Sequence, residues 1–310
     1  MTKKKALVVY YTQSGQLKDI IDSVCLPLQE EFEFTYEELK PKPAFPFPWT
    51  GMSFYQAFPE SVQEIPCELE AFNFKPEENF DLIILAYQPW YLSASVPFTS
   101  FLQTEEAAIV LNGKPVITIL GCRNMWAMAH ERVKRRIANL GGNLVGNIAL
   151  VDRHHNLVSV VTIVRWMLKG KRHGKGLYGK LFPEAGVDKK DIAGAGKFGE
   201  LISEAAGKDD FSGLQDELIK AGAVNIKPVL LTIEQRGYMM FKPWSKFVLK
   251  KGQAGDPARI GRLKMFRAYL FTVIYLVSPI GGIIVWAYHK LAFRKTRKLI
   301  NYYSHNELRN

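Results

Sequence analysis

The sequence predicts an α/β fold, a parallel sheet with helices on both faces. Two observations support this. Four apolar runs have the length and the β-branched or aromatic content of strands buried on both sides: Ala6–Tyr11, Phe80–Tyr87, Lys114–Gly121 and Asn143–Val151. Segments with helical spacing of apolar residues separate these runs. Strands that alternate with helices are joined by right-handed crossovers, which makes the sheet parallel.

The remaining elements follow from the same patterns. After the first strand, Leu17, Ile20, Ile21, Val24 and Leu28 recur at helical spacing. Glu31–Tyr36 alternates as a short edge strand does, and Lys227–Ile233 is a possible extra strand. Helices are expected at Gln16–Gln29, Phe98–Leu111, Met125–Leu140, Leu157–Leu168, Asp191–Ala206 and Phe211–Ala221.

The segment 41–66 is predicted to be an insertion in this fold. It is rich in proline and aromatic residues, and a loop so long inside a compact domain is functional or disordered. Two interpretations stay open: a lid or lipid-facing flap, or a set of rings that packs on the edge of the sheet. The rings in question are Phe45, Phe47, Trp49, Phe54, Tyr55 and Phe58.

Composition and charge restrict the partners. The 310 residues are 47% hydrophobic and 23% charged, with a formal net charge of +11. The basic residues crowd Lys169–Lys190 and Lys242–Lys298, beside apolar segments and without a nucleic-acid recognition motif. We therefore expect them to face a membrane rather than nucleic acid, a solvated basic face being the alternative. Three widely spaced cysteines and a start without a secretory signal indicate a reduced, cytoplasmic compartment.

The chain beyond the last strand looks different. Residues 1–225 are predicted to form the α/β domain, with an interfacial helix at 154–175, and residues 226–310 a membrane-associating helical extension. Within it, 268–288 carries no formal charge and is flanked by Lys and Arg on both sides. Ser278–Gly282 is expected to kink this segment. A kinked span, a re-entrant hairpin, an amphipathic surface pair and a buried core helix all remain open.

The turn after the first strand has the residues of an anion site. Thr12, Gln13, Ser14, Gly15 and Gln16 supply two hydroxyls, successive backbone N–H groups and a glycine at a helix start. This segment resembles the phosphate loop of flavodoxins. The resemblance implies a flavodoxin-like doubly wound sheet of strand order 2-1-3-4-5 that binds FMN. Leu17 stands where flavodoxins usually have a hydroxyl residue, so one phosphate contact is expected to be missing.

Two further loops follow strands at the same edge of that sheet. By similarity to flavodoxins, aromatic residues of the first loop flank the flavin ring, and the second donates hydrogen bonds to it. Arg123 or Asn124 is expected to stabilise negative charge on the reduced ring, and Arg123, His154 and His155 are candidates for catalysis. No metal-ligand spacing is found. The loop residues are Gln88, Pro89, Trp90 and Tyr91, then Gly121, Cys122, Arg123 and Asn124.

Taken together, the segments YYTQSGQLKDI, YQPWYLSASVP and ITILGCRNMW and the aromatic basic tail resemble the flavodoxin-like family called dialkylresorcinol condensing enzymes, from bacterial aryl polyene and flexirubin-type lipid clusters. The resemblance implies FMN-dependent oxidation of a dialkylcyclohexanedione to a dialkylresorcinol. It also implies a lipid-like substrate, a ketosynthase partner and a place at the cytoplasmic face of the inner membrane. The alternatives are a membrane-associated quinone or NAD(P)H reductase and a flavodoxin-type electron carrier.

Overall fold

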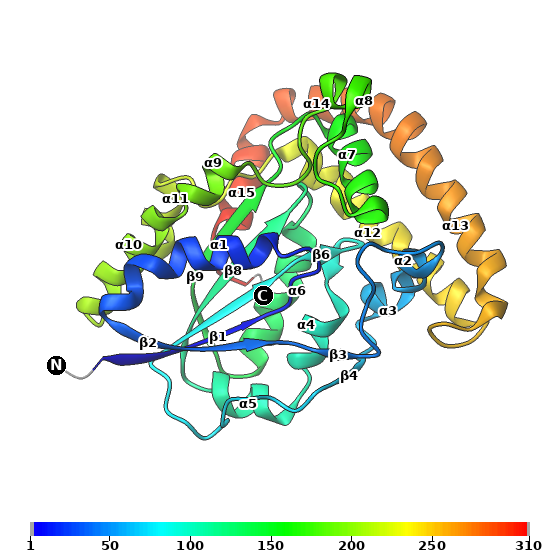
Figure 1. Cartoon of the computed structure of the whole chain (residues 1–310). Helices are drawn as coiled ribbons and strands as arrows, with labels where there is room; N and C mark the ends of the chain where they lie inside the picture. The colour runs from blue at the N-terminus through cyan, green and yellow to red at the C-terminus, as the bar shows by residue number, and fades with distance from the viewer. Residues whose placement is uncertain (1–2, 309–310) are drawn as a thin grey trace.

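A five-stranded parallel sheet forms the centre of the molecule (Figure 1). The computed structural model describes residues 3–308. The strands run in the order β2-β1-β5-β8-β9. When only the five strands of this sheet are numbered, in chain order, this is the order 2-1-3-4-5. The predicted flavodoxin-like fold class is confirmed. The bounds are β1 (Lys4–Tyr10), β2 (Phe32–Glu38), β5 (Leu82–Tyr87), β8 (Pro115–Cys122) and β9 (Asn143–Val151).

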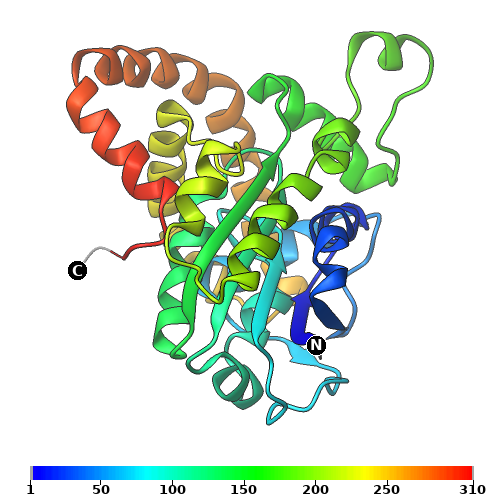
Figure 2. The ribbon, with the colours of Figure 1, turned by 90° about the vertical axis from the view of Figure 1, so that its left-hand side faces the viewer.

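Helices cover both faces of this sheet (Figures 1 and 2). On one face lie α1 (Gln16–Cys25), α10 (Gly196–Gly207) and α11 (Leu214–Lys220). On the other lie α4 (Val96–Phe101), α5 (Glu105–Leu111) and α6 (Ala127–Asn139). The predicted first helix ends early, at Cys25, and continues as the 3₁₀ helix η1 (Leu26–Glu30), which contains Pro27.

The predicted single helix Phe98–Leu111 is wrong, because the chain forms α4 and α5 with a turn between them. Thr104 ends the turn and caps α5: its side chain accepts a hydrogen bond from Ala107 N at 3.2 Å. Glu105 and Glu106 follow in the first turn of α5, where negative charge is favoured. Apolar residues recur at helical spacing across the turn between α4 and α5, so this spacing alone did not reveal the turn. The cap at Thr104 marks the start of the second helix.

The predicted strand Lys227–Ile233 is also wrong, since these residues begin the helix α12 (Pro228–Leu249). A short apolar run does not distinguish a strand from a buried helical turn. Pro228 occupies the first turn of α12, where its missing N–H is not needed. The helix α12 packs on α3 (Phe58–Gln63) and α6, outside the sheet.

The insertion is ordered and its rings point into the molecule. Besides α3 it contains α2 (Ser53–Gln56) and the short pair β3 (Pro41–Lys42) and β4 (Glu68–Leu69). Trp49 is 3% exposed and Phe58 is fully buried, while Phe45 and Phe54 pack against the main core. The packing interpretation is therefore correct for these rings, and they do not form a lipid-facing flap.

A long helix dominates the extension. It runs without interruption from Pro257 to Leu291 and consists of η2 (Pro257–Arg259), α13 (Ile260–Thr272), a π-helical turn η3 (Val273–Val277) and α14 (Ser278–Leu291). The re-entrant hairpin, one of the alternatives left open, is wrong, because the helix continues through Pro279, which directly follows the π turn and Ser278. Only 6% of the apolar window is buried, so it is not a core helix of this chain.

A buried ion pair attaches this helix to the insertion. Arg259, at its start, is fully buried and donates from Nη1 and Nη2 to the two carboxylate oxygens of Glu60 in α3, at 2.8 and 3.0 Å. About two helical turns further on, Phe266 stacks on Phe58 with ring centroids 3.6 Å apart. The extension and the insertion therefore share a small core of their own.

Removal of one partner of this pair will be costly. We expect Arg259→Met to lower the free energy of unfolding by about 3–5 kcal/mol, because Glu60 is then left buried without its counter-ion. Urea denaturation checks this. The matched control Lys208→Met removes a pair with Glu204 in which both side chains are exposed to solvent, and it should leave the free energy of unfolding nearly unchanged. Equal costs for the two variants would contradict the interpretation.

A second buried polar pair lies beneath the sheet. Tyr87 at the end of β5 is fully buried, and its hydroxyl lies 3.1 Å from Nδ1 of His130 in α6. Burial, with a smaller effect of Lys134, lowers the pKa of His130 to about 3. The imidazole is therefore neutral in the folded protein at pH values where it is protonated in the unfolded chain.

This pair makes stability depend on pH. The contribution of His130 is complete above its unfolded pKa of about 6.5 and is lost as the pH falls toward 3, with a slope of up to about 1.4 kcal/mol per pH unit. We expect His130→Gln, which does not titrate, to flatten the unfolding free energy between about pH 7 and pH 5. The exposed His173→Gln serves as the control. An unchanged slope in His130→Gln would refute the assignment.

Candidate functional site

The predicted anion loop lies at the carboxyl end of β1, directly before α1. Gly15 is the N-cap of α1 with a φ of 84°, a left-handed conformation that favours glycine. A Cβ built on Gly15 has nothing within 4 Å, so the space above the loop is open. The amide of Gly15 donates to Thr12 Oγ1 at 3.1 Å. The loop thus forms a small concave turn of backbone N–H groups.

The donors of this turn are available to a ligand. Lys18 N and Asp19 N both bond to Gly15 O, while the amides of Gln16 and Leu17, the first two of α1, bond to no backbone carbonyl among residues 3–308. The side chain of Leu17 is fully buried beside Gly121, so this residue offers only its N–H. A phosphate fits such a helix start. Lys18 is paired with Asp22 at 2.5 Å.

Two segments far away in the sequence hold the loop from outside. The side chain of Gln13 donates to the carbonyl oxygens of Phe45 and Pro46 in the insertion, at 3.3 and 2.9 Å. The side chain of Gln16 makes a reciprocal pair with Val187, donating to its O at 3.1 Å and accepting from its N at 2.9 Å. The loop is therefore fixed before any ligand binds.

The loop that contains Gln88–Tyr91, the second loop of the candidate site along the chain, forms a small β-hairpin that the sequence patterns did not predict. Its strands are β6 (Pro89–Trp90) and β7 (Ser93–Ala94), and the two tip residues Tyr91 and Leu92 have φ of 49° and 62°. Two consecutive positive φ values form the turn type that suits a two-residue hairpin, here without the usual glycine or asparagine. The side chain of Gln88 accepts from Gln13 N at 3.2 Å and ties the hairpin to the anion loop.

The aromatic rings of the hairpin are already packed. Trp90 is 8% exposed and makes edge contacts with Tyr11, Phe45 and Trp49. Tyr91 stacks on Phe54, and its hydroxyl donates to Phe54 O at 2.9 Å. Both rings thus have partners within the chain, and their predicted contact with a flavin ring stays a prediction.

The loop Gly121–Asn124, the third loop of the candidate site along the chain, leads into a buried polar cluster. Arg123 Nη1 donates to Asn156 Oδ1 at 2.6 Å and to Ser159 Oγ at 3.3 Å in α7 (Asn156–Lys169). Asn124 Nδ2 donates to the same Asn156 oxygen at 2.8 Å, while its own Oδ1 is buried and has no hydrogen-bond partner among residues 3–308. That acceptor is able to take a hydrogen bond from a water molecule or from a ligand.

Two buried acids complete the cluster, and sequence reasoning did not single them out. Asp152 follows β9 and is fully buried; its amide bonds to Cys122 O at 3.0 Å. Glu234 comes from α12 and accepts from Met128 N at 2.8 Å. Burial raises the pKa of Glu234 to about 8 and lowers that of Arg123 to about 10. The position of Asp152 directly after a predicted strand could have pointed to it as a site residue. Glu234 was missed because the start of α12 was predicted as a strand.

The other candidates separate clearly. His154 lies at this edge, with Nδ1 2.7 Å from Asp152 Oδ1, whereas the side chain of His155 is exposed at the start of α7. Burial raises the pKa of the Cys122 thiol well above its usual value, which keeps the sulfur protonated and a poor nucleophile. Within residues 3–308, no group of three His, Cys, Asp or Glu side chains has the arrangement of a metal site.

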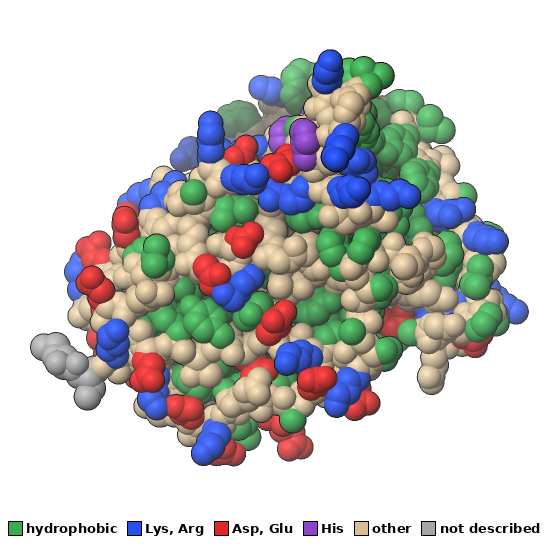
Figure 3. Space-filling view, viewed as in Figure 1, with side chains coloured by type: hydrophobic (Ala, Val, Ile, Leu, Met, Phe, Trp, Pro, Cys, Tyr) green, Lys and Arg blue, Asp and Glu red, His purple; other side chains and the backbone are tan. Residues whose placement is uncertain are grey.

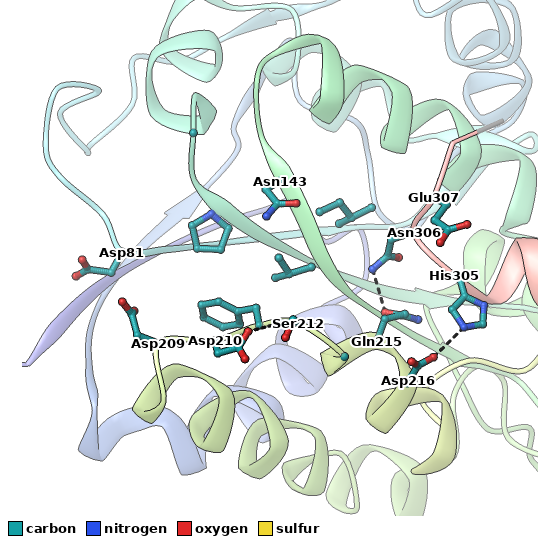
Figure 4. A pocket seen from close by; sticks show the side chains of 16 residues that line it. Asp81, Asn143, Asp209, Asp210, Ser212, Gln215, Asp216, His305, Asn306 and Glu307 are labelled. Carbon is teal, nitrogen blue, oxygen red and sulfur yellow. Dashed lines mark hydrogen bonds and ion pairs between the residues drawn. The ribbon is translucent and has the colours of Figure 1, made fainter. Parts of the chain in front are cut away.

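A cavity of about 820 Å³ lies elsewhere, at the amino ends of β8 and β9 (Figure 4). Asp81, Asp210 and Asp216 line it together with His305 of the C-terminal segment. Ligands of doubly wound sheets bind at the carboxyl ends of the strands, which is the opposite end. The hollow is a gap between the returning C-terminus and the sheet, and the candidate site remains at the three loops.

No protein-family model and no curated protein sequence matches the chain. Solved structures of flavoproteins resemble part of it. A flavoprotein from Lactobacillus acidophilus in complex with FMN is 16% identical, covers 47% of this chain and 93% of its own, and has a TM-score of 0.38. A flavodoxin from the domain Archaea is 14% identical, with 64% and 96% covered and a TM-score of 0.37.

A Fusobacterium nucleatum flavodoxin bound to FMN is 16% identical, with 49% and 74% covered and a TM-score of 0.31. Likenesses this distant carry no weight of their own. The assignment of the fold rests on the order and direction of the strands. The sheet and its anion loop are the part of the chain in which the flavodoxin pattern is recognisable.

Proposed function

We propose that this chain binds FMN and uses it to oxidise a ring that carries long alkyl chains. The observation that carries the cofactor assignment is the open turn at Gly15, beside which the amides of Gln16 and Leu17 bond to no backbone carbonyl among residues 3–308; the Thr12 and Ser14 hydroxyls belong to the same turn. The flavin ring is proposed to lie between the hairpin 88–94 and the loop 121–124.

The third loop would govern the chemistry. When bound, FMN supplies a two-electron acceptor for hydride. Arg123 stays charged, since its pKa of about 10 lies well above neutrality, and its guanidinium stabilises negative charge that develops on the ring or on a substrate enolate. Glu234, with a pKa of about 8, exchanges a proton near neutral pH.

The proposed substrate is a dialkylcyclohexane-1,3-dione, and the product is the dialkylresorcinol. This oxidation removes two hydrogens, one as a proton from a carbon next to a carbonyl and one as a hydride, and tautomerisation then gives the aromatic ring. The support is the resemblance of the three loops, together with the exposed apolar side chains of the long helix, which suit a protein that works on a lipid-like substrate. A ketosynthase partner and the cytoplasmic face of the inner membrane belong to the same proposal.

A reductase that consumes a pyridine nucleotide, or an electron carrier, would use the same loops. The direction of electron flow therefore distinguishes the three functions.

The phosphate loop is tested by Gly15→Val. We expect this variant to purify without flavin, because a valine in the left-handed conformation strains the turn and its methyl groups occupy the phosphate space. Visible absorbance and titration of the apoprotein with FMN measure the loss.

Gly213→Val is the matched control. Gly213 is also a helix N-cap, with a φ of 77° and nothing within 4 Å of a built Cβ, but it begins α11 at the far end of the sheet. It suffers the same backbone strain and should keep FMN. Flavin retained in Gly15→Val, or lost equally in both variants, would overturn the site.

The reaction is tested in a single anaerobic turnover. We expect a dialkylcyclohexanedione to bleach the visible flavin absorbance of the holoprotein and to yield one resorcinol per flavin. Arg123→Met should keep FMN and slow the bleaching by about 100-fold, since it removes one electrostatic stabiliser. Arg153→Met, whose side chain is 72% exposed and pairs with Asp191, is the control and should behave like the parent. Bleaching by a nicotinamide donor alone would favour the reductase.

A further inference from the structure

The long helix presents a wide apolar surface to the outside. Along α14 and the π turn before it, large side chains are more than half exposed on successive turns, and the space-filling view shows them as a green region over the upper right of the molecule (Figure 3). A soluble monomer rarely exposes such a continuous patch. The residues are Leu276, Val277, Ile280, Ile283, Ile284, Trp286, Tyr288 and Leu291.

Both ends of this helix are fixed to the same globular body. At the start, the Arg259–Glu60 pair and the Phe266–Phe58 stack hold it to the insertion. At the end, His289 Nε2 lies 2.9 Å from Thr232 Oγ1 of α12. A helix that crosses a bilayer has its ends on opposite sides, and these ends lie on one side.

The chain that follows confirms this return. The helix α15 (Phe293–Ser304) leads back to the sheet domain, where Gln215 of α11 donates to Ser304 O at 2.8 Å. Tyr302 OH donates to Glu131 Oε1 of α6 at 2.5 Å. Figures 1 and 2 show the long helix as an arc whose two ends meet the same domain.

The inner face of the arc is covered by α12, which runs antiparallel to it. Trp244 contacts Tyr269 near one end, with ring centroids 5.1 Å apart, and Thr232 meets His289 near the other. Arg236, Lys242 and other charges along α12 make this helix unsuitable for the hydrocarbon region. The outer face of the arc alone is available to lipid.

Basic side chains border the apolar surface. Lys264 and Arg267 are exposed at one end, and Lys290, Arg294 and Lys295 at the other. A second apolar projection lies at the same end of the molecule: Leu177 and Leu181 of α8 (Gly176–Leu181) are 73% and 67% exposed. Around it lie the exposed Lys169, Lys171, Lys175 and Lys180. Such a combination of apolar and basic side chains matches the acyl and headgroup layers of an anionic leaflet.

We infer that the long helix lies in the plane of one leaflet of an anionic phospholipid bilayer and does not cross it. Its outer face enters the boundary between headgroups and acyl chains, α8 forms a second contact, and the flanking Lys and Arg bind lipid phosphates. The chain is thus a monotopic membrane protein, and this inference does not depend on the flavin chemistry.

Binding is tested with the purified full chain and preformed vesicles of phosphatidylcholine with and without phosphatidylglycerol. We expect sedimentation with the anionic vesicles, weaker binding without phosphatidylglycerol, and loss of binding by about 100-fold or more in Ile280→Asp/Ile284→Asp. The control is Ile109→Asp, on α5, whose side chain is 50% exposed at the distant end of the molecule. It should bind as the parent does.

The topology is tested by labelling from outside the vesicles. Lys264→Cys and Lys295→Cys, one at each end of the apolar segment, should both react with a membrane-impermeant maleimide; the parent chain gives the background from its own three cysteines. If one position is shielded until detergent is added, the helix spans and the inference is wrong.

Two other results would also overturn the inference. One is a double aspartate variant that binds vesicles as tightly as the parent. The other is a parent chain that ignores vesicles and forms a dimer which the double variant breaks, because the surface would then cover a second copy. Flavin content measured on the same preparations separates these outcomes from a failure of the FMN proposal.

Discussion

The bidentate pair between Arg259 and Glu60 is the interaction on which the shape of the molecule depends. Both groups are removed from water and each satisfies the charge of the other, so the loss of either one would leave a buried charge without its partner. Glu60 belongs to a segment inserted between two strands of the sheet, and Arg259 lies about 200 residues later. Their contact turns two peripheral additions into one layer over the carboxyl end of the sheet.

This layer explains how the candidate site differs from a bare loop cluster. The insertion reaches Gln13 through the carbonyls of Phe45 and Pro46, and α12 reaches the third loop through Glu234. The hairpin tip at Tyr91 packs between the two additions. The insertion therefore helps to hold the anion loop, and α12 supplies one of the two buried acids near Arg123.

The sequence predicted the part of the fold that local patterns control. Parallel strands buried on both faces appear as unbroken apolar runs, and Asn143–Val151 has the predicted bounds. Local patterns failed where distant contacts decide. The start of α12 was predicted as a strand because its apolar run is too short to distinguish a strand from a helix. The buried pairing of Arg259 with Glu60 cannot be inferred from the sequence, in which Arg259 is one basic residue of a basic tail. Glu234 follows the segment that was predicted as a strand, and its partner, the amide of Met128, belongs to the distant helix α6.

The membrane surface inferred for the long helix has a kinetic consequence. Such a surface would hold the protein, and the polar cluster around Arg123 with it, at the bilayer in which a long-chain substrate dissolves. A hydrophobic substrate would then reach the cluster by lateral diffusion and never dissolve in water. The rate would follow the mole fraction of substrate among the lipids, and dilution with inert phospholipid would slow the protein at constant bulk concentration.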